Sequence, residues 1–373
     1  MTAVFSFFAG AGFLDLGFET SGFSMQFVNE IYGPFLEAYR HGRILLGVPK
    51  PHFGYFGDDI VSFLETEKMK DLSFMIRESR REHSFIGFVG GPPCPDFSQG
   101  GKNRGRHGDN GRLTGTYFEL ICQQKPDFFL FENVKGLWRT RRHRAFYEDL
   151  KQDLSSSGYV LAERLINAIE YGVPQDRQRI ILVGFKKNLL WDAGIKVEGM
   201  LSEEIFSWEK YLVHSADEVF SLPWPTLEPF VEDSITQCPD GLLEELTVEY
   251  WFRQNDVNNH PNSIHFFVPR GGLPKMQVID EGDVSRKSYK RLHRWRYSPT
   301  ACYGNNEVHL HPYKVRRITV AEALALQSLP VEYSLPDSMS LTDMFKTVGN
   351  GVPYLAAKSL ATSIVDFLKK IQR

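Results

Sequence analysis

The sequence predicts an α/β protein with a doubly wound, mostly parallel sheet. Short apolar segments rich in β-formers look like strands buried on both faces, at 4–9, 24–29, 84–90, 127–133 and 179–185. Amphipathic stretches that predict helices lie between them, at 13–21, 34–41 and 144–155. Because strands alternate with helices, the strands are expected to run parallel, with ligands bound beyond their carboxyl ends.

The alternation stops after Phe185. Residues 186–315 carry Trp, Pro, Asn and Gly without sustained periodicity, as in WPTLEPFVED. Regularity returns with TVAEALALQSL, which predicts a helix from Thr319 to Leu329 with a capping box formed by Thr319 and Glu322. A last helix is expected at about 353–370. We therefore predict one domain from 1–185 and 316–373, closed by the C-terminal helix, and a smaller irregular domain at 186–315.

Bulk composition is that of an ordinary globular protein of 373 residues, 42% hydrophobic and 24% charged. No apolar run approaches the roughly 20 residues that span a bilayer, and the N-terminus lacks a basic leader. A cytoplasmic protein without membrane contact is expected. The four cysteines show no paired or zinc-like spacing. The HLHP segment holds two histidines without a companion cluster, so no metal is expected.

Positive charge is concentrated locally although the net charge is −3. The basic segments are RTRRHR at 139–144, the loop after Cys94, and the stretch 284–317, in which nine Lys and Arg residues accompany one acid, Glu307. Each segment alone suits a solvated surface. Three such segments in a mildly acidic chain indicate a nucleic-acid groove.

The first predicted strand leads into FSFFAGAGFLDLGFE, where Gly10 and Gly12 allow a ligand to approach the backbone at a helix N-terminus. The next strand ends at Glu30, about 20 residues on, where an acid can bind ribose hydroxyls. FGDDI offers Asp58 or Asp59 as an adenine contact near a third strand end. A nucleoside-containing cofactor is predicted, and NAD, FAD and S-adenosylmethionine all fit this part of the sequence.

Cys94 stands in a Pro-Pro-Cys-Pro segment at the end of a predicted buried strand. A lone cysteine is more often a small buried hydrophobe, but the prolines stiffen its backbone and aim the thiol. Because a free thiol is only about 3% ionised at pH 7, a nucleophilic cysteine needs nearby cations. Lys102, Arg104 and Arg106 follow in a glycine-rich loop that could close over a substrate.

Polar residues also follow two later apolar segments. Glu132 and Asn133 end FLFENV, where a charge is costly unless partnered, and an acid role is plausible. EYGVPQDRQRI places Arg177 and Arg179 at alternating positions, so both are expected to face one side. The alternative is a surface ladder that pairs with Asp176 or Glu170.

Six segments, taken in order, resemble the motifs of the C5-cytosine DNA methyltransferase family. They are FFAGAG, GGPPCPDFS, ENV, QDRQRI, RRITVAEALALQSLP and VGNGVP. The resemblance covers 3–185 and about 315–370. Residues 186–315 are not covered by the resemblance and lie where the family has its variable target-recognition domain. It implies a class I methyltransferase sheet, with the C-terminal helix packed beside the first motif.

The resemblance also implies residue roles. Cys94 would be the nucleophile that adds to C6 of cytosine, Glu132 would hold or protonate N3, and Arg177 and Arg179 would steady the base and the adduct. The S-adenosylmethionine site would be lined by Phe8, Gly10, Gly12, Glu30, Ile31, Asp59, Ile60, Asn350 and Val352. DNA contacts are expected from Pro93, Ser98, Lys102, Arg104, Asn133, Arg291 and Arg294.

Two positions depart from the family. Ser6 stands where an acid is usual, and this change could weaken the hold on the charged end of the cofactor. Phe13 stands where a further glycine is common, and its ring could crowd the turn. We interpret both departures as tolerated variation, because every residue matched to the chemistry is present.

The expected function is methylation of C5 of a flipped-out cytosine in a specific double-stranded DNA sequence, through a covalent Cys94 adduct. The simplest setting is a bacterial restriction-modification system, with the protein monomeric, cytoplasmic and associated with the nucleoid. A restriction endonuclease would act on the same site without a stable complex. Two alternatives stay open: a tRNA cytosine-5 methyltransferase, and a catalytically dead DNA-binding regulator.

Overall fold

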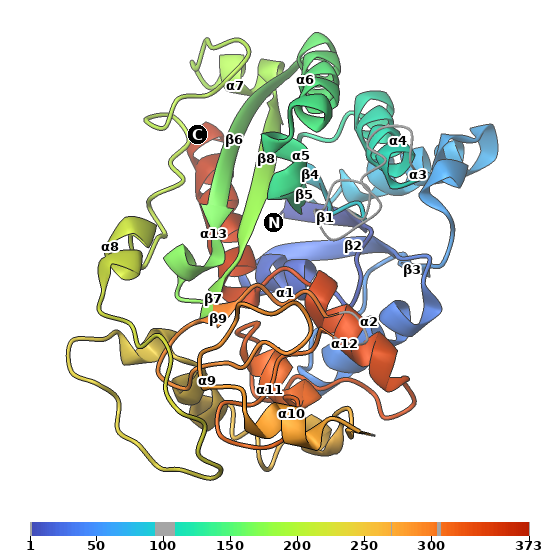
Figure 1. Cartoon of the computed structure of the whole chain (residues 1–373). Helices are drawn as coiled ribbons and strands as arrows, with labels where there is room; N and C mark the ends of the chain where they lie inside the picture. The colour runs from blue at the N-terminus through green and yellow to red at the C-terminus, as the bar shows by residue number, and fades with distance from the viewer. Residues whose placement is uncertain (1, 94–108, 270, 304–306, 373) are drawn as a thin grey trace.

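The computed structural model describes residues 2–93, 109–269, 271–303 and 307–372. A seven-stranded sheet in the order β3-β2-β1-β4-β5-β8-β6 forms its centre (Figure 1). The strands are β1 (Thr2–Phe7), β2 (Phe23–Asn29), β3 (Gly54–Phe56), β4 (Phe85–Gly90), β5 (Phe128–Val134), β6 (Tyr159–Asn167) and β8 (Gln178–Lys186). The first five pair in parallel, while β8 is antiparallel to both β5 and β6. The predicted mostly parallel sheet is confirmed.

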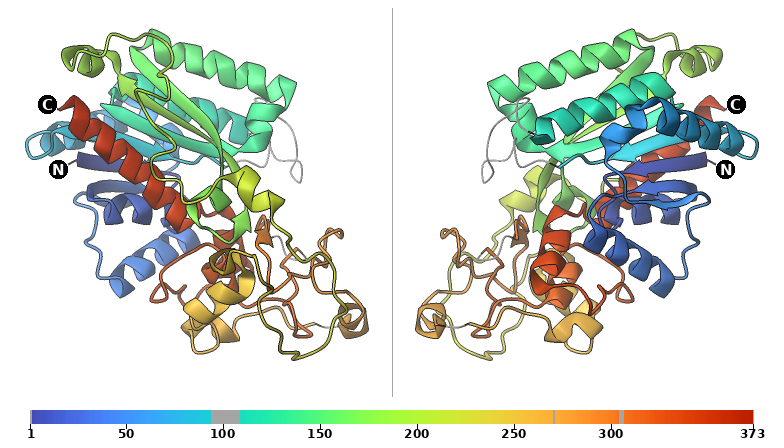
Figure 2. Two further views of the ribbon diagram at one scale, coloured as in Figure 1. Left: turned by 90° about the vertical axis from the view of Figure 1, so that its left-hand side faces the viewer. Right: turned by 90° about the vertical axis from the view of Figure 1, so that its right-hand side faces the viewer.

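Both faces of the sheet are covered by helices, which explains why β1 and β4 are buried at every residue (Figure 2). One apolar cluster joins a face of the sheet to α1 (Phe13–Thr20), α2 (Gly33–Leu45) and α13 (Tyr354–Ile371). The other joins the opposite face to α3 (Thr66–Ser79), α4 (Asp109–Gln124), α5 (Lys135–Arg139) and α6 (Arg141–Ser156). The side-chain period of two therefore places successive strand residues in different apolar clusters.

The C-terminal part returns to the beginning of the chain. In α13, Ala357 packs against Gly17 of α1, and Ser21 Oγ donates to Lys358 O at 3.2 Å. Before it come α11 (Val320–Ala325) and α12 (Leu341–Asn350). The predicted capping box is present, since Thr319 and Glu322 satisfy each other's backbone amides. This helix ends four residues earlier than predicted, and Ser328 then adopts a positive φ of 54°.

Short elements joined by irregular chain make up the middle segment. They are α7 (Lys187–Asp192), α8 (Ala216–Ser221), η4 (Glu244–Leu246), α9 (Val248–Gln254), η5 (Pro261–Ile264), α10 (Leu273–Gln277) and β9 (Ser298–Pro299), the last paired with β7 (Gln175–Asp176). One apolar cluster contains Phe252 and Tyr303 together with Leu324 and Phe345. The two predicted domains therefore share a core across residue 315, and the boundaries at 185 and 315 stay a prediction.

Within the described ranges, no helix has both the length and the apolar character that a membrane span needs.

Candidate active site

Several of the described residues that the sequence predicts for the site lie at one edge of the sheet. Since β1, β2, β4 and β5 are parallel, their carboxyl ends lie together. The turn 8–12, Glu30 and Gly91 follow the first three of these strands, and Glu132 lies near the end of β5. Two short elements add to this edge, η1 (Ile60–Leu64) after β3 and η3 (Ala168–Tyr171) after β6. This is the edge at which open α/β sheets bind ligands.

Side chains of β5 lie against the backbone that leads to Cys94. Asn133 Nδ2 donates to Pro92 O at 3.3 Å. A Cβ on Gly91 would lie 2.9 Å from Glu132 Oε2, so glycine is what lets the carboxylate approach. Pro93 is half-buried and directly follows. Cys94 itself lies outside the described residues, as do Ser98, Lys102 and Arg104.

Glu132 and Arg179 form an ion pair across β5 and β8. Glu132 Oε1 is 2.9 Å from Arg179 Nε, and the side chains are only 12% and 13% exposed. Arg179 Nη1 also donates to Gln178 O at 2.8 Å. The guanidinium compensates the carboxylate in a partly buried place, where an unpaired charge would be costly. Both groups keep enough exposure to meet a ligand.

Arg177 has a different position from the one predicted. Its buried guanidinium donates to Ala301 O at 3.1 Å, Gly349 O at 2.9 Å and Gly351 O at 3.0 Å. It thus binds the chain on both sides of Asn350, whereas Arg179 binds Glu132. We therefore reassign Arg177 from contact with the base to positioning of the segment that carries Asn350.

Gln175 is a further positioning residue, which the sequence motif contained but to which no role was predicted. Its buried amide accepts from Ala301 N at 3.0 Å and donates to Leu326 O at 3.1 Å. The alternating Gln-x-Arg spacing was the available signal. It now explains how one short segment holds three distant parts of the chain.

The glycine turn after β1 is held by Glu30. Gly10 N donates to Glu30 Oε2 at 2.9 Å, and Tyr32 N donates to Glu30 Oε1 at 2.8 Å. Burial raises the pKa of Glu30, against the lowering effect of these two amide bonds. Gly10 and Gly12 have φ of 56° and 76°, which favours glycine. Phe8 lies edge-on to Tyr117 at the entrance to the turn.

Residues after β2 and β3 extend this site. Asp59 is exposed and caps η1, its Oδ1 accepting from Val61 N at 3.0 Å. Ile60 is buried, whereas Ile31 is exposed, so Ile31 is free to cover a ligand. Asn29 Nδ2 donates to Asp58 O at 2.8 Å and thereby ties the ends of the two strands together.

Asn350 ends α12 and is exposed, and Val352 is buried beyond it. The neighbouring Gly351 has a reason in packing, because a Cβ there would lie 2.1 Å from the Phe13 ring. That ring also meets Tyr333 edge-on at 5.4 Å between centroids. The Phe13 ring thus packs against the C-terminal segment.

Ser6 has an acidic partner. Its hydroxyl donates to Asp15 Oδ1 at 2.9 Å, and both side chains are buried. Burial raises the pKa of Asp15, against the lowering effects of Arg43 and the Ser6 hydroxyl. Asp15 of α1 thus places a buried carboxyl beside residue 6.

These residues suit a nucleoside with an amino-acid end. Glu30 follows β2, where it can accept ribose hydroxyls, and the N-terminus of α1 offers amides to a carboxylate. A Cβ on Gly10 would meet no atom within 4 Å, so the turn borders open space. In the described part of the chain, no three His, Cys, Asp or Glu side chains gather as metal ligands would.

The predicted DNA contacts of Arg291 and Arg294 are corrected by their burial. Arg291 donates to Ile279 O at 2.9 Å and Lys314 O at 3.2 Å, and to two further carbonyls. Arg294 Nη2 pairs with Glu281 Oε2 at 2.7 Å. The basic sequence predicted that both side chains lie at the surface. Instead, Arg291 is bonded to buried carbonyls and Arg294 is paired with Glu281. Arg286 and Lys287 are the exposed basic residues just before them, at 49% and 78%.

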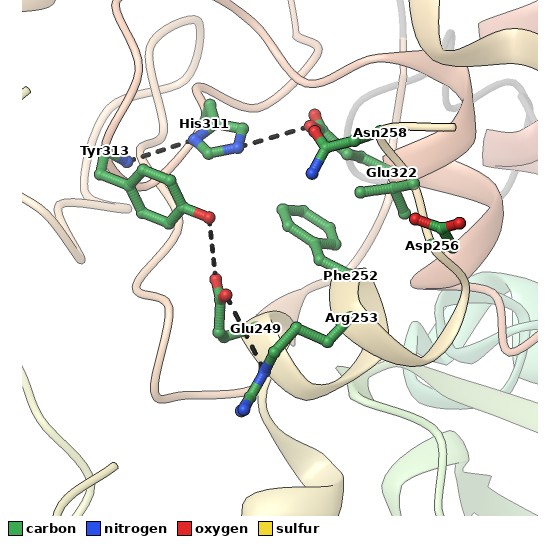
Figure 3. A pocket seen from close by; sticks show the side chains of 9 residues that line it. Glu249, Phe252, Arg253, Asp256, Asn258, His311, Tyr313 and Glu322 are labelled. Carbon is green, nitrogen blue, oxygen red and sulfur yellow. Dashed lines mark hydrogen bonds and ion pairs between the residues drawn. The ribbon is translucent and has the colours of Figure 1, made fainter. Parts of the chain in front are cut away.

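A separate cavity of about 230 Å³ lies between the middle segment and α11, lined by Glu249, Phe252, Arg253, Asp256, Val257, Asn258, His311, Tyr313 and Glu322. Figure 3 shows how the polar side chains around it lie. Its polar groups bind one another. His311 Nε2 is 3.4 Å from Glu322 Oε1, and the Tyr313 hydroxyl donates to Glu249 Oε2 at 3.0 Å. The HLHP histidines are therefore buried packing residues. Burial lowers the pKa of His309 to about 3.

Known proteins with similar sequences support one family. Residues 2–366 match the family described as C-5 cytosine-specific DNA methylase. The Type II methyltransferase M.NmeDI of Neisseria meningitidis serogroup C is 55% identical over 99% of this chain and 84% of its own length. M.FnuDI of Fusobacterium nucleatum, also named a Type II methyltransferase, is 29% identical over 97% and 94%.

Solved structures agree on the fold. The S. pombe Dnmt2 methyltransferase gives a TM-score of 0.58 at 13% identity, covering 98% of each chain. The Entamoeba histolytica methyltransferase EhMeth gives 0.61 at 12% identity, covering 99% of each chain. With the family match over nearly the whole sequence and a relative at 55% identity, this chain belongs to the C-5 cytosine-specific DNA methylase family.

Proposed function

We propose that this DNA methyltransferase acts on a cytosine flipped out of double-stranded DNA, through a covalent bond from Cys94 to C6. The observation that carries the proposal is the Glu132–Arg179 pair. Glu132 lies against Gly91, and Asn133 binds Pro92, so the acid stands beside the backbone that leads into Cys94. The reaction needs a nucleophile at C6 and an acid at N3, which lie at opposite positions of the cytosine ring.

The chemistry follows from the weakness of C5 as a nucleophile. Addition of the Cys94 thiolate to C6 moves electron density to C5, while Glu132 holds a proton at N3 and prevents negative charge from building on the ring. S-adenosylmethionine, when bound, supplies an electrophilic methyl group. Loss of the C5 proton then expels the thiolate and restores the aromatic ring. Arg179 keeps Glu132 in place throughout.

The target base must leave the duplex for this contact, at a cost of a few kcal/mol. Positive charge from Lys102 and Arg104 suits the phosphates around the opened site, with Pro93 and Ser98 near the base. Arg286 and Lys287 replace Arg291 and Arg294 as the proposed contacts from the middle segment, because they are exposed.

The setting we propose is bacterial restriction-modification, because relatives at 55% and 29% identity are named Type II methyltransferases. In such a system a cognate endonuclease cuts the same DNA sequence and needs no stable complex with this protein. The methyltransferase would then act as a cytoplasmic monomer on the nucleoid.

A covalent trap tests the proposal. When C5 carries fluorine, no proton can leave after methyl transfer, so duplex DNA with 5-fluorocytosine at the target should hold the enzyme. A denaturing gel should show a shifted band with wild type and cofactor, and none with Cys94→Ser. Glu132→Gln should slow the appearance of the band.

The control uses the same gel without cofactor, where no stable band is expected. A shifted band from Cys94→Ser would assign the nucleophile to another residue. Tritiated methyl transfer to tRNA but not to duplex DNA would instead support the RNA alternative. Cofactor binding without any transfer would support the regulator alternative.

A further inference from the structure

Arg43 lies behind the cofactor turn, near the end of α2, with its side chain buried. Its Nη2 donates to Gly12 O at 2.7 Å, and its Nη1 donates to Ala11 O at 3.3 Å. A Cβ on Gly12 would lie 2.7 Å from Arg43 Nη1, so the glycine is needed for this approach. One side chain from another helix thus fixes two consecutive carbonyls of the turn. Tyr333 adds a hydroxyl bond to Ala11 O at 3.3 Å.

The direction of these carbonyls matters to a ligand on the other side. In a planar trans peptide the C=O and N–H point in opposite directions. Carbonyls drawn toward Arg43 therefore turn the amides of Gly12 and Phe13 away from it. The Gly12 amide is already bonded to Ala9 O at 2.8 Å, and the Gly12 carbonyl also accepts from Leu16 N at 2.9 Å. The amide left to face a ligand is that of Phe13, which as the first residue of α1 has no intrahelical acceptor. Amides at a helix N-terminus attract carboxylates.

Arg43 is itself held rigidly. Its Nε donates to Glu19 Oε2 at 3.0 Å, and its guanidinium stacks 4.0 Å from the centroid of the Tyr39 ring. Asp15 adds a second buried carboxyl to this cluster. Burial raises the pKa of both Asp15 and Glu19, so the cluster is close to neutral when one carboxyl keeps its proton. A balanced, fully packed guanidinium has little freedom to move.

We propose that Arg43 is a positioning residue for the cofactor, which fixes the turn so that the Phe13 amide at the start of α1 faces the carboxylate end of an amino-acid-bearing nucleoside. Glu30 holds the opposite side of the turn through Gly10 and faces the nucleoside. The inference rests on the proposed function, since it takes the ligand of the turn to be S-adenosylmethionine. Arg43 touches the backbone of the turn and acts on the ligand only through it.

Two ligands separate this role from a general loss of structure. S-adenosylhomocysteine carries the carboxylate end, and 5′-methylthioadenosine has the same nucleoside and thioether without it. Titration calorimetry should show that Arg43→Gln raises the Kd of S-adenosylhomocysteine by about 10-fold or more, as expected for a lost charge-assisted contact. The Kd of 5′-methylthioadenosine should stay within about 2-fold of wild type.

A matched control stands on the same helix. Arg40 is exposed and lies over the Tyr55 ring, so Arg40→Gln removes an equal charge without touching the turn. It should bind both ligands like wild type. Arg43→Lys keeps the charge but cannot span two carbonyls and Glu19, so it should weaken S-adenosylhomocysteine by an intermediate factor. If Arg43→Gln does not fold by circular dichroism, the lysine variant provides the comparison.

Each outcome is decisive. Selective loss of S-adenosylhomocysteine affinity supports the positioning role. Unchanged affinity, or equal loss for both ligands, overturns it while leaving the proposed function intact. If wild type binds neither S-adenosylhomocysteine nor S-adenosylmethionine, the proposed function fails first and this inference fails with it.

Discussion

Two carboxyls share one buried guanidinium beneath the cofactor turn. Glu19 Oε2 is 2.8 Å from Arg43 Nη2, and Asp15 lies one helical turn earlier on the same helix. Burial raises the pKa of Glu19 to about 7, against the lowering effect of Arg43 and with a smaller raising effect of Asp15. At neutral pH, therefore, the charge of a core residue is poised to change.

The sign of the resulting pH dependence can be tested. A carboxyl whose pKa is raised on folding stabilises the protein fully below its unfolded pKa, and this contribution is lost as the pH rises through the folded pKa. The Glu19 contribution should fall by about 2 to 3 kcal/mol between pH 4.5 and 8. Urea denaturation of wild type and Glu19→Gln should show this change in their difference. A difference that grows with pH would mean that Glu19 stays ionised in its pair with Arg43.

The same scale shows what the sequence could reveal about individual residues. Glu30, Glu132 and Asn133 were predicted because each lies at the end of an apolar strand, where a polar side chain is costly unless it has a partner or a function. Arg291 and Arg294 were placed at the surface wrongly because charge alone does not distinguish a solvated side chain from one bonded to internal carbonyls or an acid. Such partners come from distant residues, which local spacing cannot identify.

Strands could be predicted from the sequence where nearly all of their residues are buried. Strands β1, β4 and β5 are mostly apolar in sequence because helices cover both faces of the sheet. β6 was missed because Glu163 and Arg164 interrupt its apolar pattern, and they are half-buried at the edge of the sheet. The antiparallel direction of β8 was also not predictable, since the side-chain period of a strand is the same in both directions.

Arg177 and Arg179 offer a prediction about how elements are joined. Arg177→Lys cannot span the carbonyls of Ala301, Gly349 and Gly351, so buried acceptors lose partners, at about 1–3 kcal/mol each. We expect weaker binding of S-adenosylmethionine, with kcat largely kept at saturating cofactor, because Asn350 lies within the segment that is released.

The comparison is Arg179→Lys, which should lower kcat and leave the Kd of the cofactor unchanged, since Arg179 binds Glu132. Steady-state kinetics with calorimetry separates the two variants. If both variants lose kcat equally and bind the cofactor normally, Arg177 would instead contact the target base, as the family resemblance implied.

For the whole molecule, the order of the motifs predicted the overall architecture. It was less informative about the boundaries between the two predicted domains. α13 packs on α1, as expected for a chain closed by its last helix. The middle segment, however, shares an apolar cluster with α11 and α12. Motion of the middle segment as an independent domain would break this shared core, so we expect the two parts to unfold together.

The distribution of charge over the whole molecule determines how it can bind DNA. A chain with net charge −3 must bind DNA through local positive surfaces. Arg286 and Lys287 lie in exposed ion pairs with Asp283 at 3.4 Å and Glu307 at 3.3 Å, and such pairs are weak enough to be exchanged for phosphates. If each binds one phosphate, replacing either by Ala should reduce the slope of log K against log salt by about 0.9. Fluorescence anisotropy across a salt series measures this slope.

Arg81 is the control, because it is 74% exposed but precedes β4, at the edge of the sheet opposite the active site. Arg81→Ala should leave the slope unchanged, whereas an equal fall in all three variants would mean that the effect reflects net charge and not contact with phosphate.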